Sequence, residues 1–335
     1  MRSYYLYFTV AILSFVSCSE ITVEGLGIYG TWENENIDEE IRSEIASLDR
    51  QIVKALINNQ PNVVLGMMSD TLVWSLDEKF KPLVEQASYV FKDSEFESLN
   101  KFYVKNSDVG KSNTVFSGLS GTQDYIIRYK SLNKEMFISL LIQKDEKSQF
   151  VIANIYGKYP QGWKLNIMQF GQYTIQGNNA VDLFLAAKSN YQKGHLIDAA
   201  NEMFLSSQIS KPANEYWQYL KEEEMRGFFE QLRMELKEEY EFPVSISQVP
   251  SQPQIFNIYP MDMNEGYFPV VEYLTRIELE DTASTKAEND QVHALIGHLF
   301  NGIDQDKKYI VYKAYNRFPD GKTQIPSYGF VKDLE

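Results

Sequence analysis

Cysteine is the scarcest residue of this sequence, because Cys18 is its single cysteine. A lone cysteine cannot form a disulfide within the chain, so it pairs with another chain, stays reactive or is chemically modified. A stabilising framework of internal disulfides is therefore excluded.

Positive charge and long apolar runs are also in short supply. The chain has 32 lysine and arginine residues against 46 aspartate and glutamate residues, which gives a formal net charge of −14. This balance disfavours nucleic acid and anionic lipid surfaces as partners. Beyond the N-terminus, no stretch approaches the roughly 18 apolar residues that a transmembrane helix needs. With 44% apolar and 14% aromatic residues, the body can still fill the cores of two or three domains.

Motifs that carry reactive chemistry are missing as well. The sequence contains no glycine-rich phosphate loop, no His-Glu-x-x-His pair and no Gly-x-Ser-x-Gly elbow. We expect His195 at a helical turn, and His293 and His298 on one helix but about 140° apart around its axis. Zinc ligands must converge on one point, so these histidines predict no zinc site. We therefore predict no metal, no cofactor and no catalytic residue.

Carboxylates are plentiful but scattered. The runs 222–224 and 238–239 are typical of solvated helix faces. Asn301, Asp304 and Asp306 have only part of the spacing of a calcium-binding loop. The 22 tyrosines either line a glycan or peptide groove or, as is more usual for aromatic residues on strands, fill the core.

The N-terminus is typical of a targeting segment. Arg2 precedes an apolar run over residues 4–16, which has the length of a signal-peptide core and is too short to span a bilayer. The stretch Leu13-Ser14-Phe15-Val16-Ser17-Cys18 resembles the lipobox of bacterial lipoproteins. Its looser form, with Phe15 three residues before the cysteine, is similar to that of Bacteroidota lipoproteins.

That resemblance implies that residues 1–17 are a signal peptide and that Cys18 is diacylated and becomes the first residue of the mature chain. Residues 18–35 then form the lipidated N-terminal segment that precedes the folded region. The lipid anchors the protein to the cell envelope, and the expected location is the outer membrane. The face of that membrane is left open. The alternative is an ordinary signal peptide that ends near a cysteine by chance.

The hydrophobic period changes along the body. Apolar residues recur at helical spacing over residues 37–58, and Pro61 suits the first turn of a second, short helix through Met68. We also expect a strand beginning at 69–74 and a helix over 78–91. The period then becomes two, which predicts strands over 102–104, 125–129, 136–142, 150–156 and 163–173. Helices followed by an antiparallel meander predict an α+β fold.

Residues 36–177 resemble the nuclear transport factor 2-like superfamily, which includes SnoaL-like and ketosteroid-isomerase-like proteins. The resemblance rests on Ala55-Leu56, on Ser69-Asp70 with Trp74, and on the closing Gly162-Trp163-Lys164-Leu165. It implies a cone-shaped domain in which helices cover a curved antiparallel sheet. No catalytic residue is carried over, because Asp70 matches only the start of the sheet and is more simply a turn or capping carboxylate.

One window of about 34 residues within 178–240 has the spacing Phe184, Ala187, Tyr191, Ala200, Phe204, Ser207 and Pro212. This pattern resembles a tetratricopeptide repeat. Gly194 separates two amphipathic helices, Ala199 and Ala200 permit close helix packing, and Pro212 opens a longer helix over 213–240. Lys188 departs from the pattern, where the repeat prefers a small residue. One repeat predicts either a helical hairpin that braces its neighbours or a peptide-binding groove.

Residues 241–335 are expected to form a small α+β domain of no recognised family. Residues 242–253 carry three prolines and suit a linker or irregular edge, and residues 255–259, 269–279 and 309–315 alternate like strands. Ser284 is the predicted cap of a helix that ends at Asn301-Gly302, and residues 319–321 predict a turn.

Two functions remain open from sequence. The first is a non-enzymatic envelope lipoprotein that binds a protein or small ligand through the cone, the hairpin or both. The alternative is a hydrolase or isomerase that uses a buried carboxylate and tyrosines inside the cone, which requires a pocket that holds at least one acid.

Overall fold

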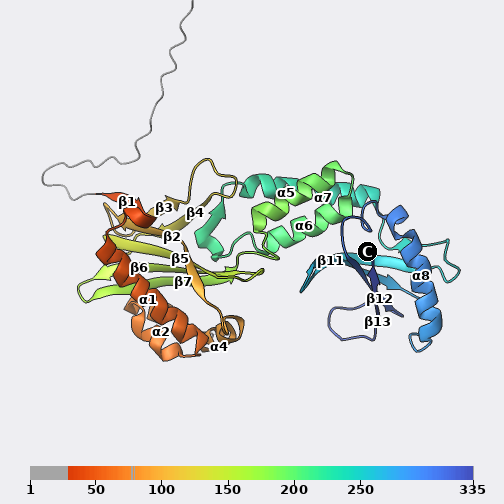
Figure 1. Ribbon diagram of the computed structural model, residues 1–335, viewed down its shortest axis with the longest axis horizontal. Helices are drawn as coiled ribbons and strands as arrows, with labels where there is room; N and C mark the ends of the chain where they lie inside the picture. The colour runs from red at the N-terminus through yellow and green to blue at the C-terminus, as the bar shows by residue number, and fades with distance from the viewer. Residues whose placement is uncertain (1–28, 77, 79, 335) are drawn as a thin grey trace, which may run out of the picture.

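The computed structural model describes residues 29–76, 78 and 80–334, so the predicted signal peptide over 1–17 and Cys18 lie outside the described residues. The chain is α+β, as the sequence predicts. It is elongated: a helix-covered sheet occupies one end, helices α5, α6 and α7 the middle, and a second sheet with helix α8 the other end (Figure 1). None of the described helices has both the length and the apolar character that crossing a membrane requires.

The first sheet is antiparallel throughout, with strand order β1-β2-β5-β6-β7. Strands β2, β5, β6 and β7 confirm four predicted strands and extend them. The bounds are β1 Gly30–Glu33, β2 Phe96–Lys105, β5 Glu135–Gln143, β6 Phe150–Tyr159 and β7 Gly162–Gln172.

One face of this sheet is covered by α1 (Glu39–Ile57), α2 (Pro61–Met67), and α4 (Phe80–Val90) (Figure 1). The predicted first helix is confirmed. Asp38 caps it, because its carboxylate accepts hydrogen bonds from the backbone N–H groups of Glu40 and Ile41 at 2.9 and 3.4 Å. The apolar side of α1, including Ile45 and Ile52, packs against this face of the sheet.

The strand predicted to begin at 69–74 is wrong, because this segment forms the short helix α3 (Asp70–Ser75). The hydroxyl of Ser69 accepts a hydrogen bond from the backbone N–H of Leu72 at 3.3 Å and caps the helix. Capping therefore outweighs the β-branched and aromatic residues that favour a strand. Trp74 is 89% exposed and does not enter the sheet.

The other face of the sheet is buried as well. Alternate residues such as Phe102, Met136 and Ile138 pack there in one continuous core with a three-stranded sheet and helices α5–α7. The sheet order is β3-β4-β8, and the bounds are β3 Ser112–Phe116, β4 Tyr125–Lys130 and β8 Trp217–Tyr219.

The middle of the molecule is a helical hairpin of α5 (Ala180–Gln192) and α6 (Leu196–Gln208), followed by α7 (Glu222–Glu239). Asn179 and Asp182 form a reciprocal capping box at the start of α5. Gly194 has a φ of +77° at the turn, as a helix end with a left-handed residue requires. The long helix predicted over 213–240 begins late, because residues 217–219 pair with β4 instead.

The C-terminal sheet has the order β13-β12-β11-β10-β9, and only β11 and β12 are parallel. Helix α8 connects these two strands and packs on the sheet. Its cap is Asp281 rather than the predicted Ser284, whose N–H donates to that carboxylate at 3.1 Å. The bounds are β9 Val244–Ser245, β10 Gln254–Met263, β11 Gly266–Leu274, α8 Thr282–Leu299, β12 Tyr309–Tyr315 and β13 Tyr328–Asp333.

Candidate functional site

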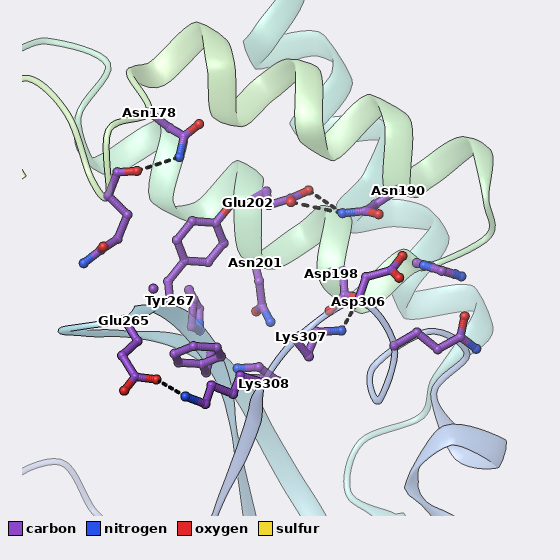
Figure 2. Close-up of a pocket in the computed structure, with 17 residues that line it drawn as sticks. Asn178, Asn190, Asp198, Asn201, Glu202, Glu265, Tyr267, Asp306, Lys307 and Lys308 are labelled. Carbon is purple, nitrogen blue, oxygen red and sulfur yellow. Dashed lines mark hydrogen bonds and ion pairs between the residues drawn. The ribbon is translucent and has the colours of Figure 1, made fainter. Parts of the chain in front are cut away.

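A polar cavity of about 550 Å³ lies where the helical hairpin meets the C-terminal sheet (Figure 2). Helix α6, the end of α5, the β10–β11 turn and the loop before β12 all contribute side chains to it. We call it the junction pocket. Its polar lining residues include Asn190, Asp198, Asn201, Glu202, Glu265, Tyr267, Asp306, Lys307 and Lys308.

Helix α6 places the central side chains of the junction pocket. Asn201 and Glu202 follow Asp198 by three and four residues, so all three side chains lie on one face of the helix. The opposite side of α6 carries residues such as Ala199 and Met203, which belong to the core shared with the first sheet. The amphipathic pattern of the hairpin thus turns a strip of polar groups toward the C-terminal sheet.

Glu202 is the most perturbed acid in the pocket. Its two carboxylate oxygens accept hydrogen bonds from the Nδ2 of Asn190 at 3.0 and 2.9 Å (Figure 2). Tyr267 lies beside it, and burial of the ring, helped by the nearby Glu202 carboxylate, raises the pKa of the phenol. Burial raises the pKa of Glu202 to about 7, and the hydrogen bonds from Asn190 only partly offset that rise. No ion pair to a lysine or arginine forms at Glu202 within the described residues.

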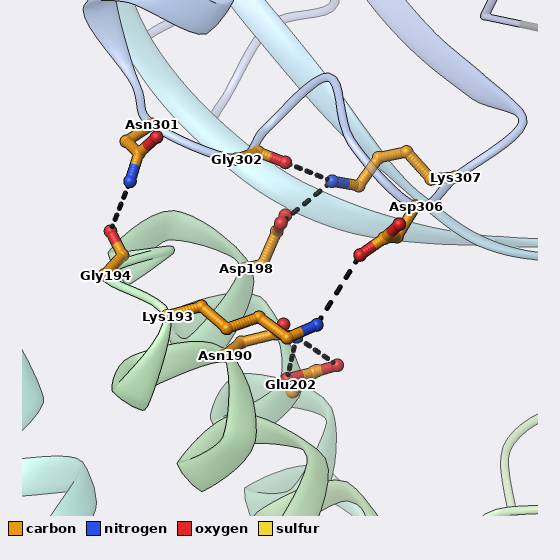
Figure 3. A network of polar contacts seen from close by, with 9 residues as sticks. All are labelled: Asn190, Lys193, Gly194, Asp198, Glu202, Asn301, Gly302, Asp306 and Lys307. Carbon is orange, nitrogen blue, oxygen red and sulfur yellow. Dashed lines mark hydrogen bonds and ion pairs between the residues drawn. The ribbon is translucent and has the colours of Figure 1, made fainter.

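Asp198 and Lys307 link the hairpin to the loop before β12. The Nζ of Lys307 lies 2.8 Å from the Oδ2 of Asp198 and also donates to the backbone oxygen of Gly302 at 2.8 Å (Figure 3). Burial raises the pKa of Asp198, and the charge of Lys307 partly offsets the rise. A weaker pair joins Lys193 to Asp306 at 3.5 Å nearer the surface.

The same junction packs closely at the turn of the hairpin. The Nδ2 of Asn301 donates to the backbone oxygen of Gly194 at 3.3 Å (Figure 3). Gly302 has a φ of +86°, and a Cβ atom there would lie 2.2 Å from the ring of His195. Glycine is therefore required at 302 by both conformation and space.

Asn201 gives the junction pocket unused hydrogen-bonding capacity. Its side chain is directed into the cavity and is only 8% exposed (Figure 2). The hydrogen bonds found in the described part of the chain include none to its amide, which has two donor hydrogens and one acceptor oxygen. The four acids of the lining, Asp198, Glu202, Glu265 and Asp306, outnumber its two lysines, so the pocket disfavours anions.

The structure places the residues considered in the sequence as follows. His195 precedes α6 as expected and lines the junction pocket. His293 lies on α8, and its Nδ1 shares a hydrogen bond of 2.9 Å with the hydroxyl of Tyr312. His298 is exposed in the last turn of α8. Asp70 is exposed in the first turn of α3. Within residues 29–76, 78 and 80–334, no three His, Cys, Asp or Glu side chains are grouped to hold a metal ion.

A second polar cluster, which sequence reasoning missed, lies between α1 and the first sheet. Asp49 is 4% exposed, and its carboxylate accepts hydrogen bonds from Ser139 Oγ, Asn154 Nδ2 and Tyr156 Oη at 2.6, 2.9 and 2.6 Å. Burial raises the pKa of Asp49, against the effect of these donors. Its spacing from Ile45 and Ile52 on the apolar stripe was the available signal.

Comparison with known proteins gives one distant similarity. Over 117 residues the chain is 26% identical to thymidylate synthase of Leuconostoc mesenteroides subsp. mesenteroides, and the match covers 34% of this chain. The chain spans about a third of the length of this curated relative, since the match covers 35% of it. A match of this extent shows no family. No protein-family model and no solved structure matches the chain.

Proposed function

We propose that this protein is a lipid-anchored envelope lipoprotein that binds a small, uncharged, hydroxyl-rich ligand in the junction pocket. Its role is recognition rather than catalysis. The first sheet with its covering helices supports a nuclear transport factor 2-like unit, and α5 with α6 supports a tetratricopeptide-like hairpin, which here braces two sheets.

The observation that carries this proposal is the Asn201 amide, which faces the pocket without a protein partner on a residue that is only 8% exposed. Its nitrogen and oxygen are open to the cavity, so a bound hydroxyl group can both donate to the amide and accept from it. Tyr267 and Phe268 line the same cavity and provide apolar surface for the carbon face of a ring. The excess of carboxylates disfavours a phosphorylated or acidic ligand.

Saturation-transfer NMR of the full chain with a panel of neutral mono- and disaccharides tests the proposal. We expect at least one saccharide to bind saturably, and Asn201→Leu to weaken that binding about tenfold or more, because one buried hydrogen-bonding group is lost. The matched control is Asn62→Leu, which changes an exposed asparagine on α2. Absence of binding across the panel, or equal affinity of both variants, contradicts the ligand class.

The membrane anchor is a separate part of the proposal and rests on Cys18 in its lipobox-like context. Cys18→Ala is expected to release the protein into the soluble fraction, because two or three acyl chains on one residue are what hold a lipoprotein stably in a bilayer. Cell fractionation with metabolic labelling by an alkyne fatty acid measures both effects. Persistent membrane attachment of the unlabelled variant contradicts the anchor.

A second candidate function is a hydrolase or isomerase, and the buried Asp49 favours it. This acid lies in the N-terminal unit beside the hydroxyls of Tyr156 and Ser139, and its pKa is raised by burial as a general base requires. Turnover of an ester or ketone substrate that is lost in Asp49→Asn, with the fold retained, would replace binding by catalysis as the function.

A further inference from the structure

A groove of about 520 Å³ lies between helix α1 and strands β2 and β5 of the first sheet, and it shares no lining residue with the junction pocket. Its apolar lining comes from α1 and from strands β2 and β5. These side chains are Ala46, Val53, Ile57, Phe96 and Leu141. A cavity of this size can hold a drug-sized apolar body.

Cations surround this apolar lining. Arg50 and Lys54 lie about one turn apart on α1, and Lys101 lies on β2 at the other side of the groove. Within the described parts of the chain, none of the three side chains forms an ion pair or a hydrogen bond. The three cations form no salt bridge in the described part of the structure, although the chain has a formal net charge of −14 and abundant carboxylates, and only the charge of Lys101 acts on the buried Asp49 of the same groove.

The acids at the groove limit how much negative charge it can accept. Glu95 lies at its margin, and Asp49 lies at its base, held by the three donors already described. Asp49 is only 4% exposed and its carboxylate is engaged by these three donors, which lowers its repulsion of an anion in the groove. The balance suits one anionic head group and not a polyanion.

We propose that this groove binds a long-chain carboxylate, with the acyl chain on the apolar lining and the carboxylate among Arg50, Lys54 and Lys101. The apolar side chains alone would accept any oily molecule. The cations favour a ligand with a negatively charged head group, because a carboxylate forms ion pairs with them whereas a neutral head group leaves them without a partner. The site is distinct from the junction pocket, so its failure leaves the proposed function intact.

The probe for this site is dansyl-aminoundecanoate, a fluorescent long-chain carboxylate, with its methyl ester as the uncharged counterpart. The protein is the full chain carrying Cys18→Ser, which removes lipid attachment and the need for detergent. We expect saturable fluorescence enhancement with the acid and about tenfold weaker binding of the ester. The triple change Arg50→Gln, Lys54→Gln and Lys101→Gln should weaken acid binding about tenfold and leave the ester unaffected.

Two further variants separate the contributions of charge and apolar surface. The control Lys81→Gln, Lys286→Gln and Lys322→Gln removes the same charge from exposed residues that do not line the groove and should leave both affinities unchanged. Val53→Trp should fill the groove and weaken both probes, with circular dichroism to verify the fold. The proposal is overturned by absence of saturable binding, by equal affinity for acid and ester, or by a control that weakens binding as much as the groove variant.

Discussion

The ammonium nitrogen of Lys307 lies 2.8 Å from a carboxylate oxygen of Asp198. Both side chains are largely buried, with exposed fractions of 13% for Lys307 and 12% for Asp198. Asp198 belongs to the helical hairpin and Lys307 to the loop before β12, and the two residues are 109 positions apart in the sequence. The pair therefore joins two parts of the elongated molecule that local structure alone would leave separate. It also forms one wall of the junction pocket.

Asp198→Ala is expected to lower the free energy of unfolding by about 3 kcal/mol, because it leaves the buried ammonium of Lys307 with only the Gly302 carbonyl. Urea denaturation measures this. The matched control is Lys193→Ala, which removes the outer pair with Asp306 at 3.5 Å from a lysine side chain that is 51% exposed, and it should change stability little. Equal losses in the two variants would show that burial does not strengthen the inner pair.

Glu202 is expected to make the protein less stable as the pH rises from about 4.5 to about 7. The ordinary pKa of a glutamate is 4.5, and burial raises the pKa of Glu202 to about 7 in the folded chain, so the folded state binds more protons in this window. Ionising Glu202 in the folded chain therefore costs about 3 kcal/mol. Glu202→Gln should therefore be more stable than the parent at pH 8 and no more stable below pH 4.5, as measured by urea denaturation across this range.

The exposed Glu215→Gln is the control for that experiment and should leave the pH profile unchanged. Burial raises the pKa of Asp198 in the same direction, so the difference between parent and variant isolates Glu202. A parent profile that rises between pH 5 and 7, or a Glu202→Gln profile identical to that of the parent, contradicts the assignment.

Asp49→Ala is expected to cost about 3 kcal/mol of stability, because Ser139, Asn154 and Tyr156 then lose the acceptor that their buried donors share. Chemical denaturation followed by circular dichroism gives the value. Glu40→Ala changes an exposed acid on the same helix and should have a much smaller effect. If both variants lose the same stability, the cluster does not hold α1 on the sheet.

Trp217→Ala should cost about 4 kcal/mol, because Trp217 is fully buried and stacks on Tyr125 with ring centroids 3.7 Å apart. The loss should also reduce the near-ultraviolet circular dichroism signal of the packed aromatic rings. Trp74→Ala removes the same side chain from a position that is 89% exposed and is the natural control. A large loss in Trp74→Ala would indicate that this residue packs against something beyond the described chain.

Helices and strands with a clear hydrophobic period were predictable from sequence. The apolar stripe of α1 follows from burial of one side of the helix, and the nearly continuous apolar runs of β5 and β6 follow from burial of both faces of the sheet. The strand predicted at Ser69 was wrong, because a single capping hydroxyl decides the start of α3. Strand β8 was missed, because three residues carry too little period and its conformation depends on pairing with β4.

The candidate sites were less predictable than the elements. Asp49 interrupts an apolar stripe, so its burial could have been suspected, but its partners on β5 and β6 are 90 to 107 positions away. The spacing of Asp198, Asn201 and Glu202 places them on one face of α6 as soon as a helix is predicted there. That this face meets Tyr267 and Lys307 depends on how the C-terminal sheet docks.

The sequence by itself determined the α+β class, the position of most elements and the expectation of a lipid attached at Cys18, because these depend on local period, turn chemistry and a short motif. Only the tertiary structure decided where the acids go. Burial raises the pKa of both Glu202 and Asp49, although their hydrogen bonds lower it, and no local pattern encodes which distant side chain will be a neighbour.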